Sequence, residues 1–508
     1  MLKVAAVFSN DMVLQRDKNV SVWGESDCDK VSVSVNELGI CVDAVCENGS
    51  WKATLPPMKA QNSVTVVVKA GNEQKTFTNV AVGEVWLCGG QSNMELEIRN
   101  AKDGKELLSS LTPDCNVRFY YTQKQGMLCD EFYKIEENTC WQSASEENSQ
   151  AWSAVGLHFG MMLAKELGVT VGLIGCNWGG TSASAWLDRE AMLSDKDTAV
   201  YVTEYEEKIA GKTLEECIRE YDEYCEYDRL WNEKSAKYYA EHENPSWDEV
   251  QEACGKNLWP GPMGPKNPFR PCGLYETMLM RVCPYTLRGF TYYQGESDDH
   301  RPDTYYKLLR MLITRWREEW GDDELSFLIV QLPMFKFEYD PDYKHWVKIR
   351  EAQMRAFRTI KNTGIAVISD CGEFNNIHPV DKKPVGERLA LQALYSTYGR
   401  SDVSAFGPLF KDVLYKENEL ELCFDNAENG LVVKGELTGF EIAGQDKVFC
   451  TAQAKVEGSR IILSCDKVTK PLYARYDCFN WCVPCIFGTN GIPLAPFRTS
   501  VNDGGLVL

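Results

Sequence analysis

The sequence has no long apolar run. No uninterrupted apolar segment approaches the ~18 residues that a membrane-spanning helix needs. The N-terminal stretch VAAVF (4–8) is too short for the core of a signal peptide. We therefore expect neither a membrane span nor a secretory signal, and we expect a cytoplasmic protein with no membrane partner.

Acidic residues outnumber basic ones. The 508 residues include 54 Lys and Arg against 74 Asp and Glu, which gives a net charge of −20. A nucleic-acid partner is disfavoured, because neutralising phosphates needs clustered Lys and Arg. An anionic surface also slows encounters with polyanions, so a small molecule is an easier substrate than an acidic polymer.

Histidine is rare, and no two of the five histidines stand at metal-ligand spacing. A metal hydrolase is therefore poorly supported. The pentapeptide G-x-S-x-G, which carries the nucleophile of α/β-hydrolase lipases, does not occur in the sequence. We predict neither a metal nor a cofactor.

Cysteine is the exception, with 20 residues scattered singly along the chain. In a reducing compartment such residues are expected to be free and buried. The C-x-x-C pair of Cys482 and Cys485 has no second pair at zinc spacing and contains a proline. This favours a structural role over a redox or metal-binding one.

Strand and helix patterns divide the chain into three parts, in line with a length that exceeds one hydrophobic core. Residues 1–80 are typical of short strands separated by turns and predict an N-terminal β-sandwich. Residues 81–404 alternate buried strands with amphipathic helices, which predicts an α/β domain with a parallel sheet covered on both faces. Residues 405–508 return to strand patterns and predict a C-terminal β-domain.

An acidic, Tyr-rich helical segment at about residues 190–265 interrupts this alternation. The favoured interpretation is a solvated helical insertion. The alternative is a lid or one wall of a substrate cleft.

Loops at the carboxyl ends of parallel strands carry function in such domains, and three segments fall there. GGQSNME places Ser92 after a strand and before a helix, where free N–H groups would stabilise developing negative charge. From its local sequence alone, Ser92 fits a helix N-cap better than a nucleophile. NWGGT exposes the backbone N–H groups of Gly179 and Gly180, and YYQGES places the Gln294 amide at a strand end. Together these are the donors that an oxyanion hole needs.

A serine nucleophile requires a base, and His378 is the best placed histidine. It lies in NNIHPVDKK, on a loop between a strand and a helix that Pro379 stiffens. His300 follows GESDD near the same edge and is a candidate substrate contact. The remaining histidines are expected to be structural: His158, His242 and His345.

In this order GQSNM, WGGT, YQGES and IHPVDK resemble the sialate O-acetylesterases and related carbohydrate esterases of the SGNH hydrolase superfamily. Three further segments extend the resemblance over nearly the whole chain: DMVLQRDKNVSVWG (11–24), LYETMLMRVCPYTLRGFTYYQGES (274–297) and PLAPFRT (493–499). The resemblance implies a three-layer α/β/α core flanked by β-domains. It also implies Ser92 as nucleophile and His378 as base. The implied oxyanion hole consists of Gly179 or Gly180, Gln294 and the Ser92 N–H.

One position departs from the family pattern. Many relatives carry an Asp two residues before the histidine, where this chain has Asn376. Asn376 itself, Asp370, Glu373 or a backbone carbonyl are the candidates for orienting His378. The alternative is a Ser–His pair without a third member.

The function implied is hydrolysis of acetyl esters on sugars through an acyl-serine intermediate. O-acetylated sialic acid, notably the 9-O-acetyl ester, is the favoured substrate, and acetylated xylan or mannan oligosaccharides are the alternative. A more remote alternative is an inactive sugar-binding module, against which the joint presence of Ser92, Gln294 and His378 argues. The expected partner is a small O-acetylated sugar or oligosaccharide.

Overall fold

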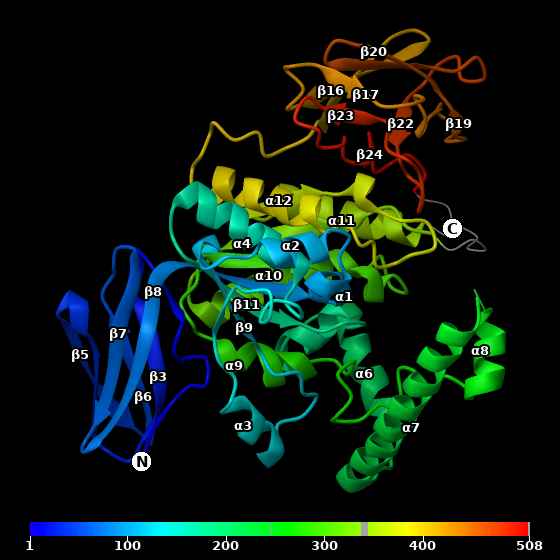
Figure 1. Cartoon of the computed structure of the whole chain (residues 1–508). Helices are drawn as coiled ribbons and strands as arrows, with labels where there is room; N and C mark the ends of the chain where they lie inside the picture. Colours follow the sequence, from blue (N-terminus) through cyan, green and yellow to red (C-terminus); the bar gives the residue numbers. More distant parts are fainter. Residues whose placement is uncertain (244, 337–343, 506–508) are drawn as a thin grey trace.

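The computed structural model describes residues 1–243, 245–336 and 344–505. A β-sandwich at the N-terminus, a central α/β body and a C-terminal β-region follow one another along the chain (Figure 1). A long helix, α7, stands apart from the central body on the side away from the sandwich (Figure 1).

The N-terminal region consists of two antiparallel sheets that share β5 (Ile40–Glu47). Buried and exposed residues alternate along its strands, so one face of each sheet packs inward. The first sheet adds β1 (Leu2–Val4), β3 (Val20–Ser26) and β6 (Ser50–Leu55). The second adds β4 (Lys30–Val35), β7 (Gln61–Ala70) and β8 (Glu73–Gly90), with the short β2 (Val13–Gln15) beside β8.

The strand β8 continues from the sandwich into the central sheet. Its second half pairs in parallel with one strand on each side. In spatial order the parallel strands are β9 (Val117–Tyr121), β11 (Val171–Asn177), β8, β12 (Gly289–Tyr293), β13 (Ser326–Gln331) and β14 (Thr363–Val367). The short β10 (Gln142–Ser143) pairs antiparallel with the edge strand β9.

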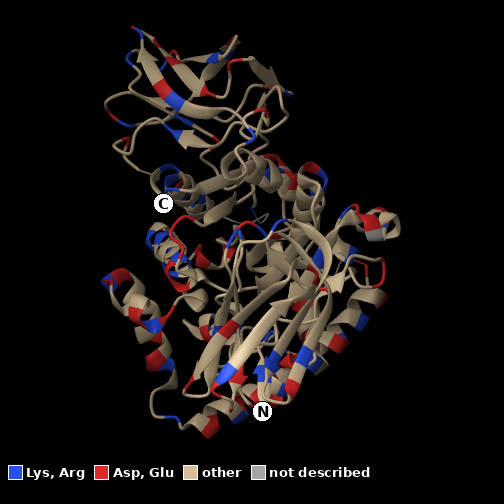
Figure 2. Ribbon diagram, turned by 90° about the vertical axis from the view of Figure 1, so that its left-hand side faces the viewer, with Lys and Arg blue, Asp and Glu red and all other residues tan. Residues whose placement is uncertain are grey.

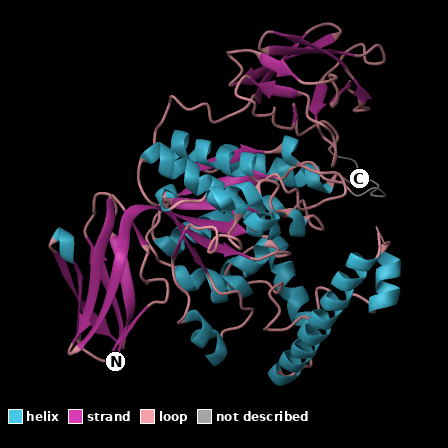
Figure 3. Ribbon diagram, in the orientation of Figure 1, coloured by secondary structure: helices cyan, strands magenta, loops and turns pink. Residues whose placement is uncertain are grey.

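Helices cover both faces of this sheet (Figure 3). A Cβ on Gly156 of α4 (Ala154–Leu167) would lie 3.4 Å from Cys88 Sγ, whereas a Cβ on the next strand residue, Gly89, would lie 2.9 Å from Trp316 of α10 (Tyr305–Trp320). Successive strand residues point to opposite faces, so α4 and α10 lie on opposite sides. The helix α12 (Lys383–Gln392) packs on α4, and α11 (His345–Thr359) packs on α10. The predicted α/β class with a covered parallel sheet is confirmed.

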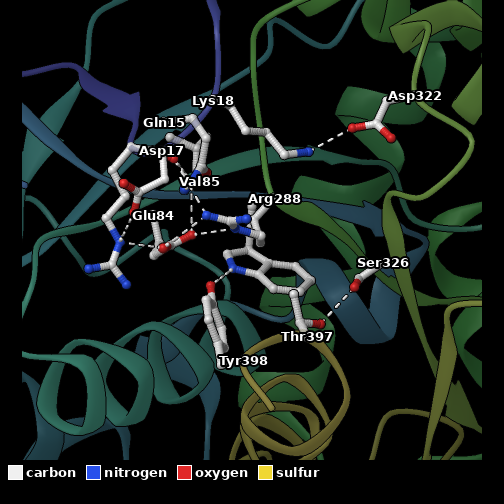
Figure 4. Close-up of polar contacts among 12 residues, drawn as sticks. Gln15, Asp17, Lys18, Glu84, Val85, Arg288, Asp322, Ser326, Thr397 and Tyr398 are labelled. Carbon is white, nitrogen blue, oxygen red and sulfur yellow. Dashed lines mark hydrogen bonds and ion pairs between the residues drawn. The ribbon is translucent and has the colours of Figure 1, made fainter. Parts of the chain in front are cut away.

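A buried carboxylate ties the base of the central sheet together (Figure 4). Glu84 of β8 is fully buried, and it pairs with Arg16 at 2.6 Å and with Arg288 at 2.9 Å. Gln15 also donates to Glu84 at 2.9 Å. These partners come from the N-terminal segment and from the residue before β12, so one charge joins three parts of the chain.

The C-terminal region has its own hydrophobic core between antiparallel sheets. One sheet contains β15 (Leu409–Tyr415), β16 (Glu419–Asp425), β21 (Arg460–Ser464) and β20 (Gln453–Glu457). The second contains β19 (Cys450–Thr451), β18 (Phe440–Ala443), β22 (Tyr473–Tyr476) and β24 (Phe497–Arg498), and β17 (Leu431–Val433) pairs with β23 (Ile486–Gly488). Arg498 binds Glu351 of α11, which docks this region on the central body.

The segment at 190–265 is helical, as predicted. It contains α5 (Arg189–Leu193), α6 (Lys196–Ile209), α7 (Leu214–Glu241) and α8 (Trp247–Cys254). Thr213 and Glu216 form a capping box that starts α7. Figure 2 shows acidic residues interspersed with basic ones along the helices. The described ranges also contain the shorter α-helices α1 (Ser92–Glu95), α2 (Gly104–Ser110), α3 (Asp130–Glu136) and α9 (Met280–Val282).

Within the described ranges, no helix combines the length and apolarity needed to cross a membrane. All 20 cysteines are free thiols. The expected division at residue 80 falls inside β8, whereas residue 404 lies in the loop before β15. The three-domain division stays a prediction.

Candidate active site

The candidate site lies at the carboxyl ends of the central strands. The chain passes from β8 to β9 and β11 on one side, and then to β12 on the other. A crevice forms where strand order reverses in this way, because the loops on either side diverge. Ser92 follows β8 at this point.

Glycine makes the exit from β8 possible. Gly90 has φ +132°, and a Cβ there would lie 2.1 Å from the carbonyl oxygen of Tyr293. The backbone N–H of Gln91 donates to the same oxygen at 3.0 Å. The chain therefore turns tightly, and Ser92 becomes the first residue of α1.

The structure brings Ser92 and His378 together. His378 Nε2 lies 2.8 Å from Ser92 Oγ, which is hydrogen-bond distance for a serine and its base. Burial lowers the pKa of His378, the charge of Lys382 lowers it further, and Glu95 opposes both. The imidazole is thus held in the neutral form that can accept a proton.

None of the three candidate orienting residues binds the His378 ring. Asn376 Oδ1 accepts the backbone N–H of His378 at 3.0 Å, and Asn376 Nδ2 donates to Glu373 at 2.8 Å. Glu373 also accepts the N–H of Val380 at 2.7 Å, while Asp370 pairs with Arg388. In the part of the chain that the structure describes, no group hydrogen-bonds the Nδ1 atom of His378. Asn376 and Glu373 shape the loop instead.

The expected oxyanion donors are only partly free. The N–H of Gly179 donates to Glu95 Oε2 at 2.6 Å. Gly180, with φ +73°, lines the pocket next to Ser92. Across the described ranges, the N–H groups of Gly180 and Ser92 have no protein acceptor, so these two remain available for an oxyanion.

Gln294 does not reach the pocket, contrary to its expected place there. It is 1% exposed, and its Nε2 donates to Thr181 O at 3.2 Å and to Asp298 Oδ2 at 2.6 Å. Its Oε1 accepts from Tyr305 OH at 3.0 Å. Both amide hydrogens are therefore used inside the scaffold. The position of Gln294 at the end of a strand did not predict which way its side chain points.

A cavity of about 700 Å³ opens beside Ser92 and His378. Part of its wall comes from α6 and the segment after α8: Tyr201, Glu204, Tyr205, Lys208, Trp259 and Met263. The insertion is thus one wall of the cleft at α6 and residues 259–263. For α6 and residues 259–263 the alternative prediction, a wall of the substrate cleft, is therefore confirmed, and the favoured prediction of a solvated insertion is wrong. By contrast α7 and α8 stand clear of the cavity lining.

The cavity wall carries an aromatic ring and basic groups. Trp259 is 60% exposed and packs edge-on against Phe269 at 5.4 Å between ring centroids. Arg301 pairs with Glu204 and lies 4.9 Å above the ring of Tyr201. Lys208 makes no ion pair with any described residue.

The remaining histidines lie where expected. His300 is exposed and lines the cavity, consistent with a substrate contact. His158 is buried in α4 beside Asp103, at 3.3 Å. His242 stacks on Tyr238, and His345 lies 3.5 Å from Asp299 at the start of α11.

Sequence reasoning missed two buried residues next to the pair. Asn93 and Lys382 are both fully buried, and Lys382 Nζ donates to Asn93 Oδ1 at 2.6 Å. Each stands inside a motif already singled out, GQSNM and IHPVDK. The available signal in the sequence was a lysine, Lys382, in the same motif as the candidate base His378.

Comparison with known proteins shows a consistent similarity to one type of carbohydrate esterase. The protein-family model described as "Carbohydrate esterase, sialic acid-specific acetylesterase" matches residues 266–394, which include Gln294 and His378. Sialate O-acetylesterase from Pongo abelii is 25% identical, over 99% of this chain and 93% of its own length. The Homo sapiens protein is 25% identical with the same coverage. The Mus musculus protein is 26% identical over 83% of this chain and 79% of its own length.

A solved structure extends the similarity to the whole fold. A carbohydrate acetylesterase from Xanthomonas citri superposes with a TM-score of 0.76 at 27% identity, covering 98% of this chain and 99% of that one. The resemblance read from the motifs is confirmed. In its fold, and along almost its whole length, the chain is similar to carbohydrate esterases of the sialate O-acetylesterase type.

Proposed function

We propose that this enzyme hydrolyses O-acetyl esters of sugars, with O-acetylated sialic acid as the favoured substrate. The observation that carries the proposal is the 2.8 Å contact between Ser92 Oγ and His378 Nε2 beside a cavity large enough for a sugar. The names of the relatives support the substrate class.

Acylation begins when Ser92 Oγ attacks the acetyl carbonyl carbon and its proton passes to His378 Nε2. The carbonyl electron pair moves to oxygen, where the N–H groups of Ser92 and Gly180 can receive the negative charge. Collapse of this intermediate expels the sugar oxygen, which takes the proton from His378. Acetyl-Ser92 and the free sugar hydroxyl result.

Deacylation repeats the sequence with water. His378 takes a proton from the water that attacks the acetyl carbon, and Ser92 Oγ then leaves and recovers that proton. Acetate is released and the enzyme returns to its starting state. In both steps the neutral imidazole accepts one proton and returns it.

The cavity wall supports the preference for an acidic sugar. Sialic acid carries a carboxylate, and Lys208, which makes no ion pair with any described residue, lines the cavity. An acetylated xylan or mannan oligosaccharide remains the second candidate, favoured by the exposed ring of Trp259, since ring stacking on a neutral sugar needs no charge.

Acetate release separates the candidates. O-acetylated sialic acid, acetylated xylo-oligosaccharides and acetylated manno-oligosaccharides are compared at equal ester concentration, with Lys208→Met as the variant. The proposal expects the highest kcat/KM on sialic acid and a loss confined to that substrate in Lys208→Met. A higher kcat/KM on the neutral oligosaccharides, unchanged by Lys208→Met, would assign the enzyme to hemicellulose.

A further inference from the structure

A buried lysine lies directly behind the candidate catalytic pair. Lys382 immediately precedes α12 and is 0% exposed. Its Nζ donates to Asn93 Oδ1 at 2.6 Å and lies 5.1 Å from the centroid of the Tyr293 ring. Burying an ammonium group is costly, so such a residue is retained only where other groups compensate its charge.

Asn93 links the lysine to both members of the pair. It follows Ser92 in the chain, and its Nδ2 donates to the carbonyl oxygen of Ile377, which precedes His378, at 2.9 Å. The same Nδ2 donates to Glu296 Oε1 at 2.5 Å. One fully buried amide therefore joins the serine helix, the histidine loop and the turn after β12.

Glu296 supplies the opposite charge. It is 5% exposed, and its Oε2 has no hydrogen-bond partner in the described part of the chain. Burial raises the pKa of Glu296. Burial lowers the pKa of Lys382 to about 7, opposed first by Glu296 and then by Cys371, Glu373 and Asp381. A lysine and a glutamate thus compensate each other through Asn93.

We propose that Lys382 is a positioning residue that holds Ser92 and His378 in register through Asn93, and that its buried charge acts on the His378 imidazole. This inference rests on the proposed function for its kinetic meaning. Its structural content, an electrostatic coupling between Lys382 and His378, does not depend on the substrate.

The direction of the effect follows from charge alone. A cation close to an imidazole disfavours a second positive charge, so Lys382 lowers the pKa of His378, while Glu95 acts in the opposite sense. Neutralising Lys382 should raise that pKa. The acidic limb of kcat/KM, which reports the free enzyme's base, should then move to higher pH.

Histidine NMR measures this coupling without substrate. The chain has only five histidines, so the ¹³Cε1–¹H signals of labelled protein can be assigned with single His→Gln variants and titrated. Lys382→Gln and Lys382→Met should raise the midpoint of His378 by roughly 1 pH unit, the scale of a nearby charge. Lys382→Arg, which keeps the charge, should leave the midpoint in place while lowering kcat through a displaced Asn93.

The neighbouring Lys383 provides a matched control. It is exposed and acts on a different histidine, since the pKa of His158 is lowered mainly by burial and, to a smaller extent, by Lys383. Lys383→Gln should leave the His378 midpoint and kcat/KM unchanged. A His378 midpoint that moves equally in Lys382→Gln and Lys383→Gln would mean general surface charge and would overturn the proposal.

The wild-type protein gives a second test in case the neutral variants do not fold, as judged by circular dichroism. The His378 signal should show a second inflection near pH 7, where Lys382 loses its proton, and Lys382→Arg should abolish it because arginine does not titrate there. A single inflection in the wild type, or identical curves in wild type and Lys382→Arg, would refute the coupling. A Ser92→Ala variant that keeps its esterase activity would refute the proposed function. It would leave the wild-type titration curves, and so the test of Lys382, unaffected.

Discussion

The carboxylate of Glu95 lies 2.6 Å from the backbone nitrogen of Gly179 and occupies the N–H group that was expected to face an oxyanion. Glu95 is also the negative charge that raises the pKa of His378 against burial and Lys382. The same side chain thus shapes one wall of the site and tunes its base.

Glu95→Gln should therefore shift the acidic limb of kcat/KM to lower pH. Removal of the carboxylate lowers the His378 pKa, so the neutral base persists at more acidic pH, while the glutamine oxygen can still accept from Gly179. A pH–rate profile on a chromogenic acetate ester measures the limb. Glu97→Gln is the control, and a shift to higher pH would contradict the assignment.

Ser92→Ala should lower ester hydrolysis by at least about 10³-fold, because the nucleophile is lost while the fold is kept. Covalent labelling by a serine-directed phosphonate, followed by mass spectrometry, should disappear in the same variant. Ser194→Ala, at an exposed position outside the cavity lining, should label and turn over like the wild type. Persistent labelling of Ser92→Ala would point to another nucleophile.

Gln294→Ala should act mainly on stability. The amide makes three buried hydrogen bonds with Thr181, Asp298 and Tyr305, and truncation leaves those partners unsatisfied. We expect a loss of about 1–3 kcal/mol in the free energy of unfolding, measured by urea denaturation. A kcat reduced about 10²-fold with unchanged stability would instead restore an oxyanion role.

Trp259→Ala should raise KM for acetylated sugars several-fold and leave a small chromogenic acetate ester nearly unaffected. The exposed ring lines the cavity, so it can contact a sugar that the small ester lacks. Trp247→Ala, at an exposed tryptophan on α8 outside the cavity lining, is the control. Equal losses on both substrates would place Trp259 in the scaffold.

Glu84→Gln should cost about 3–5 kcal/mol of stability, because it leaves Arg16 and Arg288 at the base of the sheet without their carboxylate (Figure 4). Thermal unfolding measures the loss. Activity at low temperature should persist, since Glu84 lies at the start of the parallel part of β8 and Ser92 lies beyond its end. A wild-type melting temperature would show that the arginines find other partners.

The sequence predicted that Ser92 and His378 lie at one edge of the sheet because both residues follow strands, whereas their roles as nucleophile and base were implied by the family resemblance. A parallel sheet brings all its carboxyl ends to one edge, so motifs far apart in the chain meet there whatever lies between them. That reasoning places Ser92 and His378 at one edge but does not fix which way a side chain turns. The direction of Gln294 depends on Asp298 and Tyr305, which no local pattern reveals.

Other features depend on tertiary partners in the same way. The charge of Lys382 becomes informative only once Glu296 and Asn93 lie beside it. Helical periodicity predicted α6 and α7 equally well, but it could not show that α6 meets the cavity and α7 does not. The cytoplasmic location stays a prediction.

The continuous strand β8 has a consequence for how this enzyme can be dissected. Its 18 residues span roughly 60 Å and belong to two sheets at once. A truncation at residue 80 would cut through β8 and remove β2, the strand that pairs with residues 81–83, and so leave an unpaired sheet edge. The sandwich and the hydrolase body should accordingly unfold in one cooperative transition. Substitutions that destabilise the N-terminal strands should also disturb the far end of β8, where Ser92 begins its helix.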